Sequence, residues 1–137
     1  MSTVVRVVAA VIVRNGHVLA AKRGPQMSLA SLWEFPGGKT ESSESPQAAL
    51  RREIREELGC VIRVGRHINT TSHRYDFGMV VLSAFYAEIE SGEPEPLEHS
   101  ELMWCRPGRL STLNWAPADL PAVEAVTSSL LAIGPQV

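Results

Sequence analysis

Runs of β-branched and other apolar residues, rather than a helical repeat, dominate the start of the chain. Residues 4–13, VVRVVAAVIV, are apolar at every position except Arg6. The dipeptide Asn15-Gly16 follows, and a second apolar run, HVLAAKR, begins directly after it. The first run could pass for the core of a signal peptide but is too short to span a membrane. Because Val and Ile favour strands and Asn-Gly favours a tight turn, we predict a β-hairpin.

The pattern then changes from loops to one well-marked helix. Residues 24–46 are rich in Gly, Pro and Ser, which predicts loops around a short strand at 32–35. Ser45 and Pro46 are typical of a helix start, and Gly59 is typical of a helix stop. We therefore predict a helix between them, whose apolar positions include Ala48, Ala49, Ile54 and Leu58.

The second half of the chain alternates strand-like and loop-like segments. Residues 60–72 and 73–90 are predicted as strands, 91–101 as an acidic loop and 102–106 as a short strand. A C-terminal helix is marked by Leu120, Val123, Val126, Leu130 and Leu131. Several strands with two separated helices predict an α+β or mixed α/β domain, in which the helices cover the sheet. We expect one domain over residues 1–137.

Composition narrows the classes of function. The 137 residues suffice for one core, and the net charge is −2 with Lys and Arg scattered among Asp and Glu. This distribution argues against a nucleic-acid polymer as partner, and a small anionic substrate would need a metal ion or a few local cations. Cys60 and Cys105 stand in no metal-binding pattern, which favours reduced thiols in a cytoplasmic protein.

The predicted helix gathers three glutamates on one side. Glu53, Glu56 and Glu57 are three and four residues apart, so their charges repel on neighbouring positions of one face. One interpretation is a solvated helix face neutralised by Arg51, Arg52 and Arg55. The other is a site for a hard cation such as Mg²⁺, which prefers carboxylate oxygens. The preceding Pro-Gly-Gly-Lys favours the second, because glycines let backbone approach a ligand while Lys39 supplies a cation for phosphate.

Residues 38–60, GKTESSESPQAALRREIREELGC, resemble the Nudix box, G-x5-E-x7-R-E-U-x-E-E-x-G-U. Ile54 fills the first aliphatic site, and Cys60 departs from the second as a small apolar substitute. The constant sites are filled by Gly38, Glu44, Arg52, Glu53, Glu56, Glu57 and Gly59. Seven fixed positions at set spacing are far more specific than a lone glycine-rich motif. The resemblance implies a Nudix fold, a mixed β-sheet sandwiched between helices, and hydrolysis of a nucleoside diphosphate linked to another group.

The resemblance also implies roles for the residues of the box. Glu53, Glu56 and Glu57 become ligands of Mg²⁺ or Mn²⁺, joined by the carbonyl of Gly37 or Gly38, while Arg52 and Glu44 orient them. A base must accept the proton of the attacking water. Glu98, in PLEHSELMW, is favoured because its loop resembles that of relatives acting on nucleoside triphosphates, with Glu101 and the box glutamates as alternatives. His99 beside it could orient a neighbour, although a lone loop histidine is more often a solvated residue.

The flanks LWEFPGGK and WAPADLP resemble MutT-like nucleoside triphosphate pyrophosphohydrolases. By position, Arg23 would face phosphate, Phe35 and Asp119 would read the base, and Trp33 and Trp115 would be core or rim residues. An ionised Asp119 only accepts hydrogen bonds. It could accept from the N4 amino group of cytosine or from the N7 hydrogen of 8-oxoguanine.

The expected reaction is hydrolysis of a (deoxy)nucleoside triphosphate, either 8-oxo-dGTP or CTP and dCTP, to monophosphate and pyrophosphate. Such an enzyme would clean the nucleotide pool as a monomer or homodimer, away from membranes. The alternatives are a hydrolase of ADP-ribose or another nucleoside diphosphate derivative, and a non-catalytic nucleotide-binding module.

Overall fold

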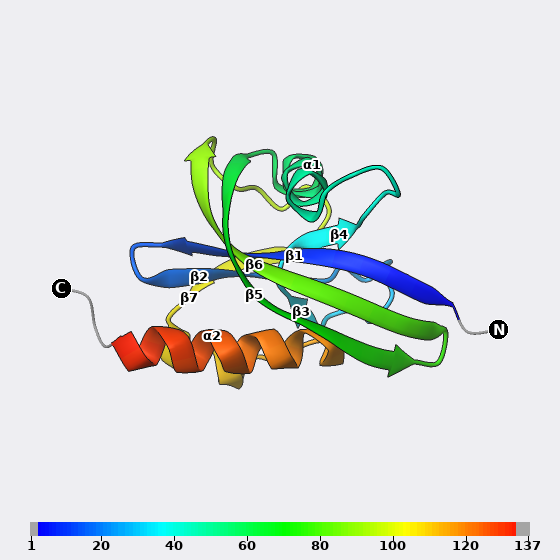
Figure 1. Cartoon of the computed structure of the whole chain (residues 1–137). Coiled ribbons are helices and arrows are strands. Elements are labelled where there is room, and N and C mark those ends of the chain that lie inside the picture. The colour runs from blue at the N-terminus through cyan, green and yellow to red at the C-terminus, as the bar shows by residue number, and fades with distance from the viewer. Residues whose placement is uncertain (1–2, 134–137) are drawn as a thin grey trace.

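Two α-helices cover opposite faces of a mixed β-sheet in the computed structural model, which describes residues 3–133 (Figure 1). Within those residues the strands are β1 (Val4–Arg14), β2 (His17–Lys22), β3 (Trp33–Glu34), β4 (Gly37–Lys39), β5 (Val61–Tyr75), β6 (Gly78–Ser91) and β7 (Glu101–Cys105). The helices are α1 (Pro46–Leu58), α2 (Leu120–Ile133) and the short 3-10 helices η1 (Pro107–Thr112) and η2 (Pro117–Asp119). The predicted mixed sheet between helices is confirmed.

The predicted N-terminal hairpin is formed by β1 and β2. Asn15 and Gly16 have φ values of 52° and 74°, the left-handed region that the tight turn requires. Val13 pairs with Val18 and Arg14 with His17 across the turn. The hairpin interpretation of this apolar run is therefore confirmed. No helix among residues 3–133 is long and apolar enough to cross a membrane.

Strand β1 is central to the sheet. The strand order is β3-β2-β1-β6-β5, with β4 also paired to β1 and β7 to β2. The pairing of β1 with β6 is parallel, and its pairings with β2 and β4 are antiparallel. Because β1 joins all three of these strands, its register determines where each of them lies.

Alternate residues of β1 pack into two different cores. Val8, Ala10 and Ile12 point to one core with α1, while Ala9 and Val11 point to another core with α2. This alternation follows from the two-residue period of a strand. Helix α1 contributes Ala49, Leu50, Ile54 and Leu58. Helix α2 contributes Ala122, Val123 and Val126.

Helix α1 has the ends that its sequence predicts. The Ser45 side chain accepts the Ala48 N–H at 3.1 Å, and Pro46 occupies the first turn. At the other end Gly59 has φ 71°, and its N–H donates to the Arg55 carbonyl at 3.0 Å. These bonds satisfy backbone groups that a helix end otherwise leaves unpaired.

Three segments differ from the sequence-based prediction. Residues 37–39, expected in a loop, form β4 because Gly37 and Gly38 pair with Ala9 and Val8 of β1. The boundary between the two long strands is wrong by a few residues: residues 73–75 belong to β5, and the turn falls at residues 76–77. Their polar and aromatic composition suits either strand, so only the pairing with β6 decides. The 3-10 helices were not predicted.

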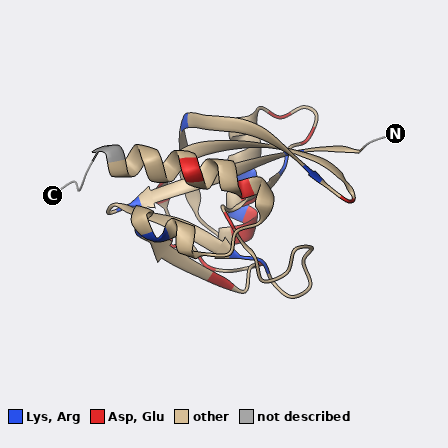
Figure 2. Cartoon of the chain, turned by 90° about the horizontal axis from the view of Figure 1, so that it is seen from below, with Lys and Arg blue, Asp and Glu red and all other residues tan. Residues whose placement is uncertain are grey.

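Charged residues of both signs are distributed along the chain, as the colours of Figure 2 show, and α2 is almost free of them. Glu124 is the one charged residue in the sequence of α2.

Candidate active site

The two glycines of β4 let α1 approach the sheet closely. A Cβ atom at Gly37 would overlap the Val8 carbonyl oxygen of β1, and one at Gly38 would overlap the carboxylate of Glu53 from α1. At Gly37 the obstacle is backbone, so only hydrogen fits there, whereas at Gly38 it is the end of the Glu53 side chain. The Glu53 carboxylate therefore lies directly against the backbone of β4.

Arg52 holds the acidic side chains of α1 and of the preceding loop in place. Its Nε and Nη2 donate to Glu44 at 2.7 and 2.8 Å, and its Nη1 donates to Glu53 at 2.8 Å. Nη2 also reaches the Lys39 carbonyl at 3.1 Å, and Nη1 lies 3.6 Å from Glu56. The hydrogen bonds from Arg52 lower the pKa of Glu44 to about 2. Glu44 thus stays ionised and fixes the guanidinium that orients Glu53.

Glu57 carries a buried carboxyl group that is influenced by three other glutamates. Its side chain is on the inner face of α1, and its Oε1 accepts the Gly37 N–H at 3.2 Å. Burial, followed by the charges of Glu34, Glu53 and Glu98, raises the pKa of Glu57 to about 9. Burial also raises the pKa of Glu53. A cation at this position would reverse both effects by favouring the ionised carboxylates.

The acidic residues have the donor chemistry of a hard-cation site. Glu53 and Glu57 are buried or half-buried, whereas the Glu56 side chain is 54% exposed. Carboxylate oxygens suit Mg²⁺ and Mn²⁺, so the residue types fit such an ion. Among residues 3–133, no three carboxylate, His or Cys side chains are arranged so that they would hold a metal ion together. The structure thus gathers the acids without showing the coordination itself.

Glu34 of β3 connects three parts of the chain, and sequence reasoning missed it. Its Oε1 accepts from Arg23 Nη1 at 2.6 Å, and its Oε2 lies 2.8 Å from His99 Nε2. The available signal was its place between Trp33 and Phe35, because a charge between two large aromatic residues of a strand needs partners. The interpretation of His99 as solvated is wrong: its side chain is fully buried.

Arg23, expected to face phosphate, is held by protein groups in this structure. Its Nε donates to the Ser28 carbonyl at 2.5 Å and its Nη2 to the Ser28 hydroxyl at 3.0 Å, in addition to the ion pair with Glu34. Lys39 lies at the end of β4 and is exposed. Glu98 is also exposed, and its charge raises the pKa of both Glu53 and Glu57, which places it on their side of the molecule.

Phe35 and Asp119, expected to read the base, are bonded to each other. The Phe35 N–H donates to Asp119 Oδ2 at 2.9 Å, and both residues are buried. Burial, followed by the charge of Glu34, raises the pKa of Asp119 to about 8. The raised pKa favours the protonated carboxyl, which has an O–H to donate, over the ionised acceptor that the sequence suggested.

Aromatic residues surround this pair. The Phe35 ring packs on Trp115 with centroids 4.7 Å apart, and Trp33 and Trp115 are both buried, as the core interpretation predicts. Tyr75, which sequence reasoning missed, accepts the Ala118 N–H at its hydroxyl oxygen at 2.9 Å. No local signal marks Tyr75, because the contact depends on how the β5–β6 hairpin meets η2.

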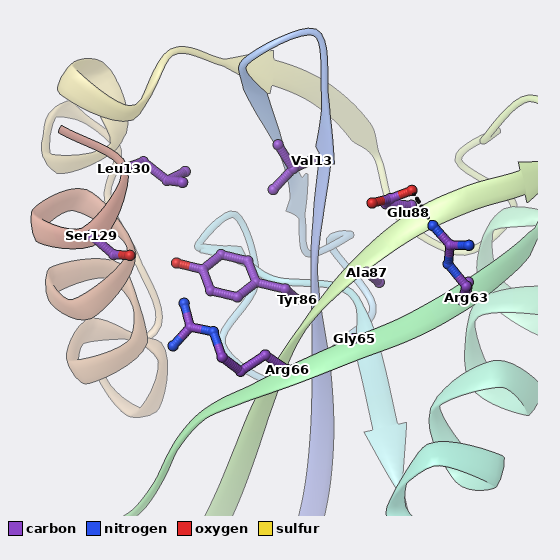
Figure 3. Close-up of a pocket in the computed structure, with 9 residues that line it drawn as sticks. All are labelled: Val13, Arg63, Gly65, Arg66, Tyr86, Ala87, Glu88, Ser129 and Leu130. Atoms are coloured by element: carbon purple, nitrogen blue, oxygen red, sulfur yellow. Dashed lines mark hydrogen bonds and ion pairs between the residues drawn. The ribbon is translucent and has the colours of Figure 1, made fainter. Parts of the chain in front are cut away.

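A hollow of about 370 Å³ lies elsewhere, between the C-terminal half of α2 and strands β5 and β6. Figure 3 shows Arg66 beside the Tyr86 ring, with the guanidinium carbon 5.1 Å from the ring centroid. None of the Nudix-box residues lines this hollow. It is therefore separate from the acidic cluster.

These observations define a mixed sheet between two helices, with the acids of one helix gathered against β4, and comparison with known proteins identifies the family. The NUDIX domain model matches residues 4–126, so the chain belongs to the Nudix family. It is 40% identical over 121 residues to the CTP pyrophosphohydrolase of Escherichia coli K12, covering 88% of this chain and 90% of that protein.

Other relatives bear different names within the same class. The chain is 38% identical over 120 residues to the putative 8-oxo-dGTP diphosphatase 2 of Mycobacterium tuberculosis, covering 82% of this chain and 81% of that protein. Among solved structures, the E. coli ORF135 protein superposes with a TM-score of 0.83 at 36% identity, covering 98% of this chain and 96% of the other. A MutT-type Nudix hydrolase from Staphylococcus aureus gives a TM-score of 0.77 at 43% identity, with coverages of 94% and 99%. The chain is a Nudix hydrolase of the MutT type.

Proposed function

We propose that this protein hydrolyses a (deoxy)nucleoside triphosphate to the monophosphate and pyrophosphate, and thereby removes damaged or surplus nucleotides from the pool. The observation that carries the proposal is the position of Glu34. Its charge raises the pKa of Glu57 on α1 and of Asp119 beside α2. The neighbouring backbone also bonds both carboxyls, because the Phe35 N–H donates to Asp119 and the Gly37 N–H donates to Glu57. We therefore assign the acidic box and the buried carboxyl to one site. A nucleoside triphosphate has a polyphosphate at one end and a base at the other, which suits these two parts.

The acidic part of the site would hold Mg²⁺ or Mn²⁺ through Glu53, Glu56, Glu57 and the carbonyl of Gly37 or Gly38. When bound, such an ion neutralises phosphate charge and lowers the pKa of coordinated water. Burial and then the charges of three nearby glutamates raise the pKa of Glu57, and four acids near one another favour a cation, which supports this assignment.

The chain's own residues then have distinct tasks. Arg52, fixed by Glu44, keeps Glu53 in one rotamer. Glu98 accepts a proton from the water that attacks phosphorus, and the anhydride bond breaks with pyrophosphate as the leaving group. The Glu98 side chain is exposed, and its charge acts on both Glu53 and Glu57, which supports this role. Lys39 and Arg23 bind phosphate oxygens, and Arg23 exchanges its bonds to Ser28 for them.

The base is read by Phe35 and Asp119. A protonated Asp119 offers an O–H donor together with acceptor capacity. Cytosine presents an amino donor beside the N3 acceptor, and 8-oxoguanine presents the N7 hydrogen beside the O6 acceptor. Both bases thus offer a neighbouring donor and acceptor. This shared pattern supports cytosine nucleotides and 8-oxo-dGTP as the two substrate candidates, in agreement with the names of the two relatives.

The test is kcat/KM with Mg²⁺ and pyrophosphate detection across CTP, dCTP, 5-methyl-dCTP, dGTP, 8-oxo-dGTP and ADP-ribose. We expect 8-oxo-dGTP or a cytosine nucleotide to exceed dGTP and ADP-ribose by at least about tenfold, which corresponds to 1.4 kcal/mol of transition-state preference. Glu53→Gln serves as the control for contaminating activity. If ADP-ribose instead had the highest kcat/KM, the protein would belong to a different substrate class of Nudix hydrolases. No turnover with any compound, but saturable binding, would indicate a nucleotide-binding module instead.

A further inference from the structure

The loop that contains Glu98 is tied down on both sides. On the α1 side, the Glu95 N–H donates to the Leu58 carbonyl at 2.9 Å and the Leu97 N–H donates to the Glu57 carbonyl at 3.2 Å. On the other side, the Ser100 N–H donates to the Lys22 carbonyl at the end of β2, at 3.0 Å. Glu98 lies between these anchors. Its carboxylate position therefore depends on how the two sides are held relative to each other.

His99, the residue directly after Glu98, is the one loop side chain buried between the anchors. Its imidazole is completely buried, and Nε2 lies 2.8 Å from Glu34 Oε2. Nδ1 is buried without a hydrogen-bond partner among the described residues. Because the Glu34 carboxylate accepts, this bond requires a proton on His99 Nε2. The other Glu34 oxygen is occupied by Arg23, so the carboxylate cannot turn away freely.

Packing alone does not account for a histidine here. A buried ring nitrogen without a partner opposes folding, and an apolar residue would avoid it. What the imidazole adds is a directional bond to Glu34 across 65 residues of sequence. The bond fixes the backbone at residue 99, and successive Cα atoms are only about 3.8 Å apart. It therefore also limits where the Glu98 carboxylate can lie.

We infer that His99 is a positioning residue which, through its bond to Glu34, holds the Glu98 carboxylate toward the acidic face of α1. The inference rests on the proposed role of Glu98 as the base. A misplacement of about 1 Å in a catalytic group can cost on the order of 100-fold in rate. The proposed substrate contacts of Lys39, Phe35 and Asp119 do not involve His99, so loss of His99 should affect turnover more than binding.

The test compares His99→Leu with His99→Gln, with His17→Leu on the β1–β2 turn as the matched control. Gln places an amide donor near the position of Nε2, whereas Leu keeps bulk without a donor. We expect His99→Leu to lower kcat by roughly 30-fold or more with KM within about threefold. His99→Gln should recover kcat to within about threefold of the wild type, and His17→Leu should leave both constants unchanged.

A double-mutant cycle with Glu98→Gln separates positioning from a general loss of structure. If His99 acts through Glu98, His99→Leu has no further effect on kcat once Glu98 is replaced. Additive losses would overturn the inference, as would equal damage in His99→Gln and His99→Leu. If His99→Leu does not fold, His99→Asn, whose side chain is too short to reach Glu34, takes its place.

Backbone NMR needs no substrate, so it tests the position of the loop separately from the proposed reaction. Backbone amide NMR shifts of residues 97–100 should change in His99→Leu and return toward wild type in His99→Gln. Unchanged shifts would overturn the inference even in an active enzyme. A wild-type protein that binds nucleotides without hydrolysing them would instead overturn the proposed function, whatever the loop does.

Discussion

Asp119 Oδ2 accepts the backbone N–H of Phe35 at 2.9 Å, which joins η2 to the residue that follows β3. Two residues further along the chain, Gly37 donates its N–H to Glu57 of α1. Residues 35–37 therefore carry one bond to the buried carboxyl of Asp119 and one to the acidic helix. The backbone of these three residues thus links η2 to α1.

Asp119 should make stability depend on pH. Its pKa is raised from an ordinary 3.8 to about 8, so between these values the folded protein holds a proton that the unfolded chain has released. This contribution to stability is complete below about pH 3.8 and is lost as the pH rises through 8. In urea unfolding with EDTA, we expect the free energy of unfolding to fall from pH 6 to pH 9 by about 2 kcal/mol more in the wild type than in Asp119→Asn.

Glu57 also has a raised pKa, so the pH dependence of unfolding in the wild type alone would not isolate the contribution of Asp119. The comparison with Asp119→Asn removes that shared contribution, because Asn keeps an acceptor for the Phe35 N–H without titrating. Parallel pH curves for the two proteins would contradict the shift assigned to Asp119.

Replacement of Glu57 by Gln should abolish most turnover and leave the fold intact. The amide is nearly isosteric and can still accept the Gly37 N–H, but it lacks the charge for a cation. We expect kcat to fall by more than about 100-fold, measured with pyrophosphate release at saturating Mg²⁺. The control is Glu88→Gln, on the exposed pair with Arg63, which should keep wild-type kcat. Normal turnover in Glu57→Gln would remove it from the acidic site.

Arg52→Lys should weaken the site although charge is conserved. Lysine has no planar fork, so it cannot bond both Glu44 oxygens and Glu53 together. We expect a loss of about 10- to 100-fold in activity and a higher Mg²⁺ concentration for half-maximal rate. Arg55→Lys, an exposed neighbour on α1, should change neither quantity. If both variants behave alike, the positioning of Glu53 does not depend on the guanidinium.

Replacement of each glycine of β4 by Ala should have a different effect, on stability at Gly37 and on activity at Gly38. At Gly38 the new methyl meets the end of a flexible side chain, Glu53, which can move aside at the expense of activity. At Gly37 it meets the backbone of β1, which cannot move without parting the strands. We expect Gly37→Ala to lower the free energy of unfolding by about 2–3 kcal/mol, and Gly38→Ala by much less.

Urea unfolding and kcat, measured on both glycine variants, decide this prediction. Gly38→Ala should lose activity while remaining folded, and Gly37→Ala should lose stability first. A stable Gly37→Ala protein would show that β4 can shift relative to Val8.

The acidic helix could be predicted because its information is local. Ser45, Pro46 and Gly59 mark its ends, and the glutamates lie within five residues of one another. Strand β4 could not be predicted, because a three-residue strand of Gly-Gly-Lys is defined by its partner β1 and not by its own composition.

The wider site depends on contacts between distant parts of the sequence. The bond between Glu34 and His99 spans 65 residues, and that between Phe35 and Asp119 spans 84. No local pattern indicates that a loop histidine will be buried against a strand glutamate. For the same reason the protonation of Asp119 could not be predicted, since it follows from burial and from the nearby charge of Glu34.

The alternation along β1 also determines which changes in chain length the protein can tolerate. One face of this strand supports the helix with the acidic box, and the other supports the helix that follows Asp119. Insertion or deletion of a single residue within β1 would turn each face toward the wrong helix, so both halves of the site would be lost in one event. Residues 24–31 form no strand or helix, and length variation there leaves that alternation unchanged.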